Sequence, residues 1–238
     1  MLVKTITGDH TGDLTGDHTR VHIFLHGLPG VRSKQNLEIA EAAARRTGAT
    51  TQVLMYSGLG HAQGEFNFLQ CVRDVEYVYT QVVEDPKVTE IQLVGHSWGG
   101  YLAIRLAKMD STKLRKIILM SPLVAFPSDP NAVAAAIGNY AKEYPHLTLG
   151  NPQVRASEMM SIRSESSIHE WIGKIPETVE VLFLQATGDQ ITPLKAAEEA
   201  LRHFKGRPVF ELVATDHSFV ENRPQLTERI AHFMSDHL

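Results

Sequence analysis

The sequence contains little of what would mark a disulfide-rich, membrane or nucleic-acid-binding protein. Cys71 is the only cysteine among 238 residues, so no disulfide can form within the chain. No apolar run approaches the roughly 20 residues needed to span a membrane, and the first residues lack the apolar core of a signal peptide. A net charge of −4 favours neither a phosphate backbone nor an anionic lipid as partner. We therefore expect a cytoplasmic protein that binds neither nucleic acid nor membranes.

Short apolar segments rich in β-branched residues alternate with helical segments along the chain. Strands are predicted at 20–26, 50–56, 89–95, 114–121, 179–186 and 208–214. Helices are predicted at 34–46, 66–84, 98–109, 192–204 and 223–236. Strands buried on both faces are almost continuously apolar, and this alternation is typical of a parallel sheet. The sequence thus predicts one α/β domain over 1–238, a mostly parallel twisted sheet with helices on both faces.

The interval 123–176 departs from this alternation because it contains no strand pattern. Helical patterns occur instead at 131–144, 151–162 and 166–175. Such an insertion either adds packing at the edge of the sheet or forms a helical cap that builds a substrate pocket. We expect the cap, because the candidate catalytic residues described below would lie beside it.

A near-repeat of Thr-Gly-Asp-His occupies residues 7–19. Its acidic and imidazole side chains are conceivable metal ligands: Asp9, His10, Asp13, Asp17 and His18. The period matches neither the EF-hand loop nor the nine-residue calcium repeat, and Gly-Asp pairs favour turns. A hairpin leading into the first strand is therefore predicted here. No His or Cys spacing elsewhere indicates a metal site, and none is expected.

The segment 93–100, Leu-Val-Gly-His-Ser-Trp-Gly-Gly, contains a Gly-x-Ser-x-Gly pattern centred on Ser97. It joins a predicted strand to a predicted helix, the context in which a tight turn projects a serine hydroxyl above a sheet. Gly95 and Gly99 have no side chains that would collide in such a turn. Ser97 is therefore the candidate nucleophile.

A serine hydroxyl is a weak nucleophile until a base accepts its proton. His217 directly follows the last predicted strand and is the candidate base, and Asp189 follows the preceding strand and is the candidate acid that orients it. The order serine, aspartate, histidine is the one expected for a sheet of this type. Asp129 is the main alternative acid, but it lies far along a proline-rich loop.

The backbone amides of Leu28 and Trp98 are the candidate oxyanion hole, because one follows an early strand and the other follows the nucleophile. Four further residues are candidate substrate contacts: His61, His96, Met159 and Met160. Each also has a structural interpretation: an exposed loop for His61, packing beneath the turn for His96, and core packing for the two methionines.

Four segments together resemble the α/β-hydrolase superfamily over essentially the whole chain: His-Gly-Leu-Pro-Gly at 26–30, Gly-His-Ser-Trp-Gly-Gly at 95–100, Gly-Asp-Gln-Ile-Thr-Pro at 188–193 and Asp-His-Ser-Phe at 216–219. Residues 56–68 are similar to the corresponding segment of capped esterases of the feruloyl/cinnamoyl-esterase and acylglycerol-lipase kind. The resemblance implies a serine hydrolase that cleaves a small to medium carboxylic ester through an acyl-enzyme, with a small-molecule substrate and no cofactor. A peptidase, thioesterase, carbon–carbon hydrolase or lyase on the same triad, and a non-catalytic binding module, are the alternatives.

Overall fold

The computed structural model describes residues 1–6, 17–30, 33–60 and 62–235. Within these ranges the chain forms a seven-stranded sheet in the order β1-β3-β2-β4-β5-β6-β7. β1 is antiparallel to β3, and the other neighbouring strands are parallel. The mostly parallel sheet predicted from the sequence is confirmed. Its strands are β1 (Leu2–Ile6), β2 (Asp17–Leu25), β3 (Ala49–Met55), β4 (Glu90–His96), β5 (Leu114–Met120), β6 (Glu180–Ala186) and β7 (Val209–Val213).

The six predicted strands correspond to β2 through β7, whereas β1 was not predicted. β1 lies at an edge of the sheet, and three of its five residues are exposed. It therefore lacks the apolar run that identifies an interior strand. Residues 7–16, which hold most of the repeat predicted to form a hairpin, lie outside the described residues.

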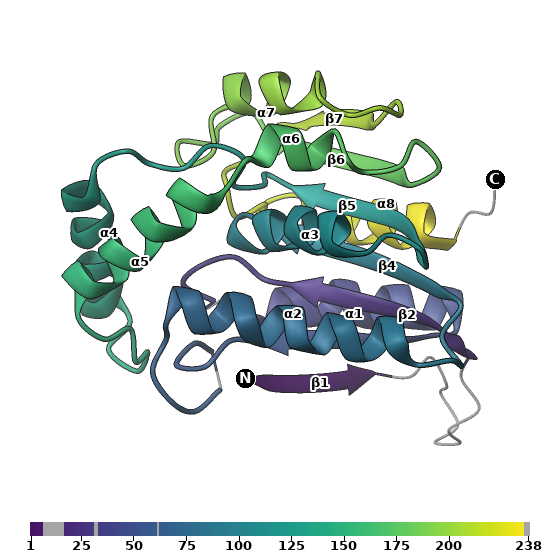
Figure 1. Cartoon of the computed structure of the whole chain (residues 1–238), viewed down its shortest axis with the longest axis horizontal. Coiled ribbons are helices and arrows are strands. Elements are labelled where there is room, and N and C mark those ends of the chain that lie inside the picture. The colour runs from purple at the N-terminus through teal and green to yellow at the C-terminus, as the bar shows by residue number, and fades with distance from the viewer. Residues whose placement is uncertain (7–16, 31–32, 61, 236–238) are drawn as a thin grey trace.

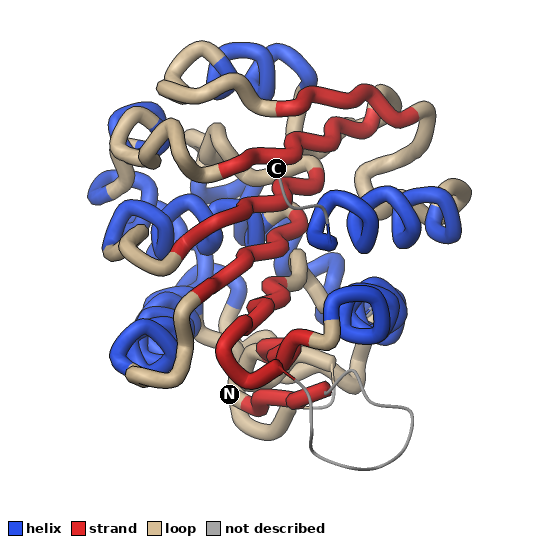
Figure 2. The backbone as a smooth tube through the Cα atoms, turned by 90° about the vertical axis from the view of Figure 1, so that its right-hand side faces the viewer, coloured by secondary structure: helices blue, strands red, loops and turns tan. Residues whose placement is uncertain are grey.

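Helices cover both faces of the sheet, as Figure 2 shows with the strands between two groups of helices. α1 (Ser33–Thr47) and α8 (Arg223–Ser235) pack on the face that includes Val94. The face that includes Leu93 is covered by α2 (Phe68–Glu84), α3 (Trp98–Met109), α6 (Ile168–Ile172) and α7 (Leu194–Leu201). Leu93 and Val94 are adjacent on β4 and point to opposite faces of the sheet. Both are buried because helices cover both faces. This explains the nearly continuous apolar sequence of the central strands.

The 123–176 insertion contains two helices that lie beyond the end of the sheet, α4 (Pro130–Glu143) and α5 (Pro152–Glu165) (Figure 1, left). Each has proline in its first turn and a side-chain cap, which favour helix initiation there. The third helix, α6, packs back against α3, where the rings of Trp171 and Tyr101 have centroids 6.1 Å apart. No helix in the described ranges is both long enough and apolar enough to cross a bilayer.

Candidate active site

Ser97 lies in a sharp turn between β4 and α3. Its backbone has φ 54° and ψ −116°, a conformation that costs a non-glycine residue on the order of 1–3 kcal/mol. Neighbouring backbone holds the turn: the Ser97 amide donates to the Met120 carbonyl at 3.0 Å, and the Ser97 carbonyl accepts from the Leu123 amide at 2.9 Å. The fold thus imposes on this serine the strained turn that the sequence predicts for a candidate nucleophile.

Close backbone packing around this turn requires glycine at Gly95 and Gly99. A Cβ atom on Gly99 would overlap the Leu25 carbonyl, and one on Gly95 would overlap the Gly99 carbonyl. The end of β2 therefore lies directly against the start of α3. The loop after β2 also approaches the turn closely, because a Cβ on Gly27 would lie 2.9 Å from the Ser97 Cβ.

His217 and Asp189 form a hydrogen-bonded pair at the carboxyl ends of β7 and β6. Nδ1 of His217 donates to Oδ2 of Asp189 at 2.7 Å. Since the carboxylate can only accept, the ring proton is on Nδ1 and Nε2 is left able to accept a proton. This is the tautomer that a general base next to a serine hydroxyl needs.

Besides the bond from His217 and a long one from the Gln185 side-chain amide at 3.5 Å, three hydrogen bonds hold the Asp189 carboxylate. Oδ1 accepts from the amides of Ile191 and Thr192 at 2.8 Å each, and Oδ2 accepts from the Thr192 hydroxyl at 2.6 Å. Burial disfavours the ionised form, but the bonds from His217 and Thr192 outweigh it and hold the pKa of Asp189 below its usual value. Thr192 was not singled out from the sequence. The signal that could have pointed to it is the aspartate itself, because aspartate side chains in turns commonly accept from backbone amides that follow them.

His96 lies behind His217. Its Nε2 donates to the His217 carbonyl at 2.8 Å, and the two ring centroids are 4.9 Å apart. Burial and the neighbouring His217 lower the pKa of His96 to about 3, so the ring stays neutral. His96 was a candidate substrate contact, but it is not among the residues that line the cavity next to Ser97. It instead supports the backbone of the candidate base.

Ser97 and His217 open onto one cavity of about 470 Å³ beneath α4 and α5. None of the described residues that line it is an aspartate, glutamate, lysine or arginine. Met159 contributes to the wall, whereas Met160 is only partly buried, packs against the hydrophobic core and is absent from the wall. His61 lies outside the described residues. The remaining lining residues are apolar or aromatic: Leu28, Phe68, Trp98, Leu123, Ala125, Phe126, Pro127, Ala132, Val133, Ala136, Ile137, Tyr140, Ile191 and Pro193.

Leu28 and Trp98 both line this cavity together with Ser97. Trp98 is the first residue of α3, where amides have no partner within the helix. Among the described residues, neither the Leu28 nor the Trp98 amide donates a hydrogen bond to the protein. Both amides are therefore available to an oxyanion, the role predicted for them.

His26 supports the loop that carries Leu28. Its Nδ1 donates to the Gly27 carbonyl at 2.7 Å, and its own carbonyl accepts from the Tyr56 hydroxyl at 3.0 Å. Burial lowers the pKa of His26 from 6.5 to about 4, so the ring is neutral in the folded protein. The unfolded chain binds a proton here more readily, and the stability contributed by the neutral ring is lost as pH falls.

We expect this histidine to make the fold acid-sensitive. The free energy of unfolding should decrease as pH falls from 6.5 towards 4. A His26→Asn variant keeps a donor for Gly27 but does not titrate, so its slope in this window should be shallower by on the order of 1 kcal/mol per pH unit. Urea unfolding at a series of pH values measures both slopes, and equal slopes would contradict this account.

Asp129, the alternative acid, is used elsewhere: its Oδ1 accepts from the Asn131 amide at 2.8 Å and caps α4. Asp216, beside His217, accepts from the Ser218 amide at 3.0 Å within its own turn. Across the described ranges, no three His, Cys, Asp or Glu side chains are grouped so that they could hold a metal ion. Asp189 is thus the carboxylate that the structure brings to His217.

Comparison with known proteins identifies the fold. No curated protein sequence matches the chain significantly. Est1E from Butyrivibrio proteoclasticus, solved with bound ferulic acid, is similar with a TM-score of 0.73 and 17% identity, over 98% of this chain and 93% of that one. The esterase EaEST from Exiguobacterium antarcticum has a TM-score of 0.71 and 18% identity, over 98% and 95% of the two chains. The enol-lactonase from Burkholderia xenovorans LB400 has a TM-score of 0.70 and 15% identity, over 99% and 96%.

Identities this low indicate a shared fold alone. The sequence model of the alpha/beta hydrolase family, by contrast, matches residues 23–232, which include Ser97, Asp189 and His217. The family match and the seven-stranded sheet described above agree with each other. The chain belongs to the alpha/beta hydrolase family.

Proposed function

We propose that the protein is a serine hydrolase that cleaves a small to medium carboxylic ester through an acyl-enzyme intermediate. One observation carries the proposal: a serine held in a strained turn shares an apolar cavity with His217, whose Nδ1 is bonded to Asp189. A buried, ionised carboxylate that orients a histidine beside a serine hydroxyl is an arrangement suited to nucleophilic catalysis.

In the proposed first step, Nε2 of His217 accepts the Ser97 proton as Oγ attacks the carbonyl carbon of the ester. The negative charge that develops on the carbonyl oxygen is stabilised by the amides of Leu28 and Trp98. Asp189 keeps the imidazole in the required tautomer and stabilises its cationic form. His217 then donates the proton to the leaving alcohol, and the acyl group stays on Ser97.

In the second step, His217 accepts a proton from water, and the resulting nucleophile attacks the acyl carbonyl. The tetrahedral intermediate collapses with return of the proton to Ser97, and the carboxylic acid is released. Neither a metal nor a cofactor enters these steps.

The cavity supports an ester with an uncharged, apolar acyl or alcohol group. None of the described residues in its wall is an aspartate, glutamate, lysine or arginine, and burying an unpaired ion there would be costly. We propose that α4 and α5 act as the cap over this small-molecule site, because both helices contribute to its wall. Esterases and an enol-lactonase among the structures of the same fold are consistent with ester chemistry.

A panel of matched acyl compounds tests the reaction class. We expect kcat/KM for p-nitrophenyl butyrate to exceed that for the corresponding thioester and aminoacyl arylamide. A higher kcat/KM for the arylamide would instead favour a peptidase on the same triad. A higher kcat/KM for the thioester would favour a thioesterase. Absence of turnover with all three would favour a binding module.

A further inference from the structure

One part of the cavity wall is built from two segments that are far apart in the sequence. Phe68 is the first residue of α2, and Met159 lies on α5; both line the cavity next to Ser97. The Phe68 ring also meets the Trp98 ring edge-on, with centroids 5.0 Å apart. A displacement of this wall would therefore change the space available to a substrate beside the candidate oxyanion hole.

Glu158 joins these two segments although it does not line the cavity itself. Its Oε2 accepts from the Phe68 amide at 3.0 Å, and its Oε1 accepts from the Asn67 side-chain amide at 2.7 Å. The first amides of a helix have no partners within the helix, and that end favours a negative charge. A carboxylate from α5 thus caps the start of α2 through charge-assisted hydrogen bonds.

Arg155 holds this carboxylate from one turn earlier on α5. Its Nη2 lies 3.0 Å from Oε1 of Glu158, and its Nη1 donates to the Phe66 carbonyl. Arg155 is 4% exposed and Glu158 is 8% exposed, so the pair is shielded from water. Desolvation offsets much of the attraction in a buried ion pair, so such a pair adds little net stability. What the pair does define is the position of α5 relative to residues 66–68.

We propose that Glu158, held by Arg155, is a positioning residue that fixes the wall formed by Phe68 and Met159 and so determines which acyl lengths the site accepts. This inference rests on the proposed ester hydrolysis. Neither charged residue lines the cavity, so the effect passes through the two wall residues.

Glu158→Gln is the informative substitution because it preserves shape and removes charge. The three groups that face the Glu158 carboxylate are donors: the Asn67 amide, the Phe68 amide and the Arg155 guanidinium. A glutamine would turn its own NH₂ group towards one of them, and the donors would move apart. The wall would shift, which affects a long acyl chain that packs against it much more than an acetyl group.

The test compares kcat/KM for p-nitrophenyl octanoate and p-nitrophenyl acetate. In Glu158→Gln the octanoate-to-acetate ratio should change by about tenfold, since a misplaced methylene in an apolar pocket has an effect of this order. The change should appear mainly in KM, with kcat for acetate nearly unchanged. Glu165→Gln is the matched control, because Glu165 is an exposed glutamate on the same helix. Its ratio should equal that of the unmodified protein.

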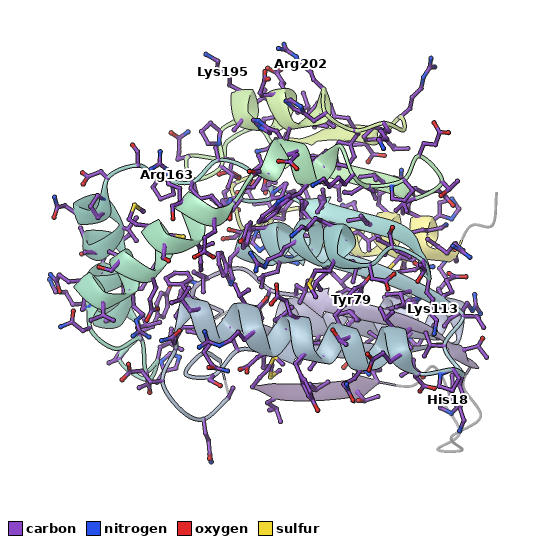
Figure 3. All side chains as sticks on the ribbon, in the orientation of Figure 1. His18, Tyr79, Lys113, Arg163, Lys195 and Arg202 are labelled. Atoms are coloured by element: carbon purple, nitrogen blue, oxygen red, sulfur yellow. The ribbon has the colours of Figure 1, made fainter. Side chains whose placement is uncertain are left out.

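A second pair of variants covers the case in which Glu158→Gln does not fold. Arg155→Lys keeps the charge but loses the planar fork, and should change the ratio in the same direction. Arg163→Lys is its control, since Arg163 is exposed and extends outward from α5 (Figure 3). Thermal unfolding identifies the folded variants. The inference would be overturned by an unchanged octanoate-to-acetate ratio in a folded variant, or by an equal loss of kcat/KM for both esters. It would also be overturned if both variants failed to fold.

A binding measurement separates this inference from the proposed function. If the unmodified protein hydrolyses neither ester, the proposed function fails. The effect of Glu158 on the wall can still be tested by measuring the binding of 1-octanol to the cavity. Trp98 lines the cavity, and Trp171→Phe leaves it as the only tryptophan, so its fluorescence reports binding. Glu158→Gln should weaken octanol binding in this background and Glu165→Gln should not; equal affinities would overturn the inference.

Discussion

Replacing Ser97 with alanine is expected to lower kcat for p-nitrophenyl butyrate by about 10⁵- to 10⁶-fold, the loss typical when the nucleophile of a triad is removed. Alanine cannot form the acyl-enzyme, and the remaining oxyanion donors would act only on direct attack by water. KM should change little, because the apolar walls that bind the substrate are intact. Steady-state kinetics with stopped-assay detection of p-nitrophenol measures both parameters.

The fold of Ser97→Ala should be retained. The positive φ at this position is imposed by backbone hydrogen bonds to Met120 and Leu123, and these do not involve the hydroxyl. Alanine therefore experiences nearly the same strain as serine. Ser164→Ala, at an exposed serine on α5, is the control and should have full activity. Substantial residual turnover in a folded Ser97→Ala protein would contradict the mechanism.

Asp189→Asn is expected to lower kcat by about 10⁴-fold through the tautomer of His217. Oδ1 of an asparagine can still accept from the amides of Ile191 and Thr192, so the loop should keep its shape. The NH₂ group then faces Nδ1 of His217, which must accept rather than donate. The ring proton moves to Nε2, and the histidine can no longer act as a base towards Ser97.

The same substitution has a pH signature in stability. The pKa of Asp189 is below its usual value of 3.8, so its ionised form stabilises the fold above that pH, and the contribution is lost as pH falls below it. The difference in free energy of unfolding between the unmodified protein and Asp189→Asn should therefore become smaller as pH falls below 3.8. Asp129→Asn is the control: asparagine also caps helices well, so both activity and stability should be unchanged. Equal losses of activity at the two positions would exclude Asp189 as the specific partner of His217.

The parts of the fold that could be predicted are those with a local signal. β4 and its neighbours are buried on both faces and are almost continuously apolar, whereas the exposed edge strand β1 has no such pattern. The candidate triad could be placed because each member follows the carboxyl end of a strand, and parallel strands bring these ends to one edge of the sheet.

The supporting contacts could not be predicted, because they join segments without any repeating pattern. His96 could have faced a substrate or the protein interior, and its bond to the His217 carbonyl, 121 residues away, determines which. The hydrogen bonds that Glu158 accepts from residues 67 and 68 likewise span about ninety positions. Side-chain contacts of this kind depend on the packed tertiary structure and leave no periodic trace in the sequence.

The most direct test of the central claim is to treat the protein with a fluorophosphonate and locate the adduct by peptide mass spectrometry. Attack by an activated serine would leave the phosphonyl group on Ser97, and labelling should be lost in Ser97→Ala and strongly slowed in Asp189→Asn. We expect a single modified peptide that contains residues 93–100. Absence of an adduct from the folded protein, or an adduct on another residue with Ser97 unmodified, would contradict the central claim.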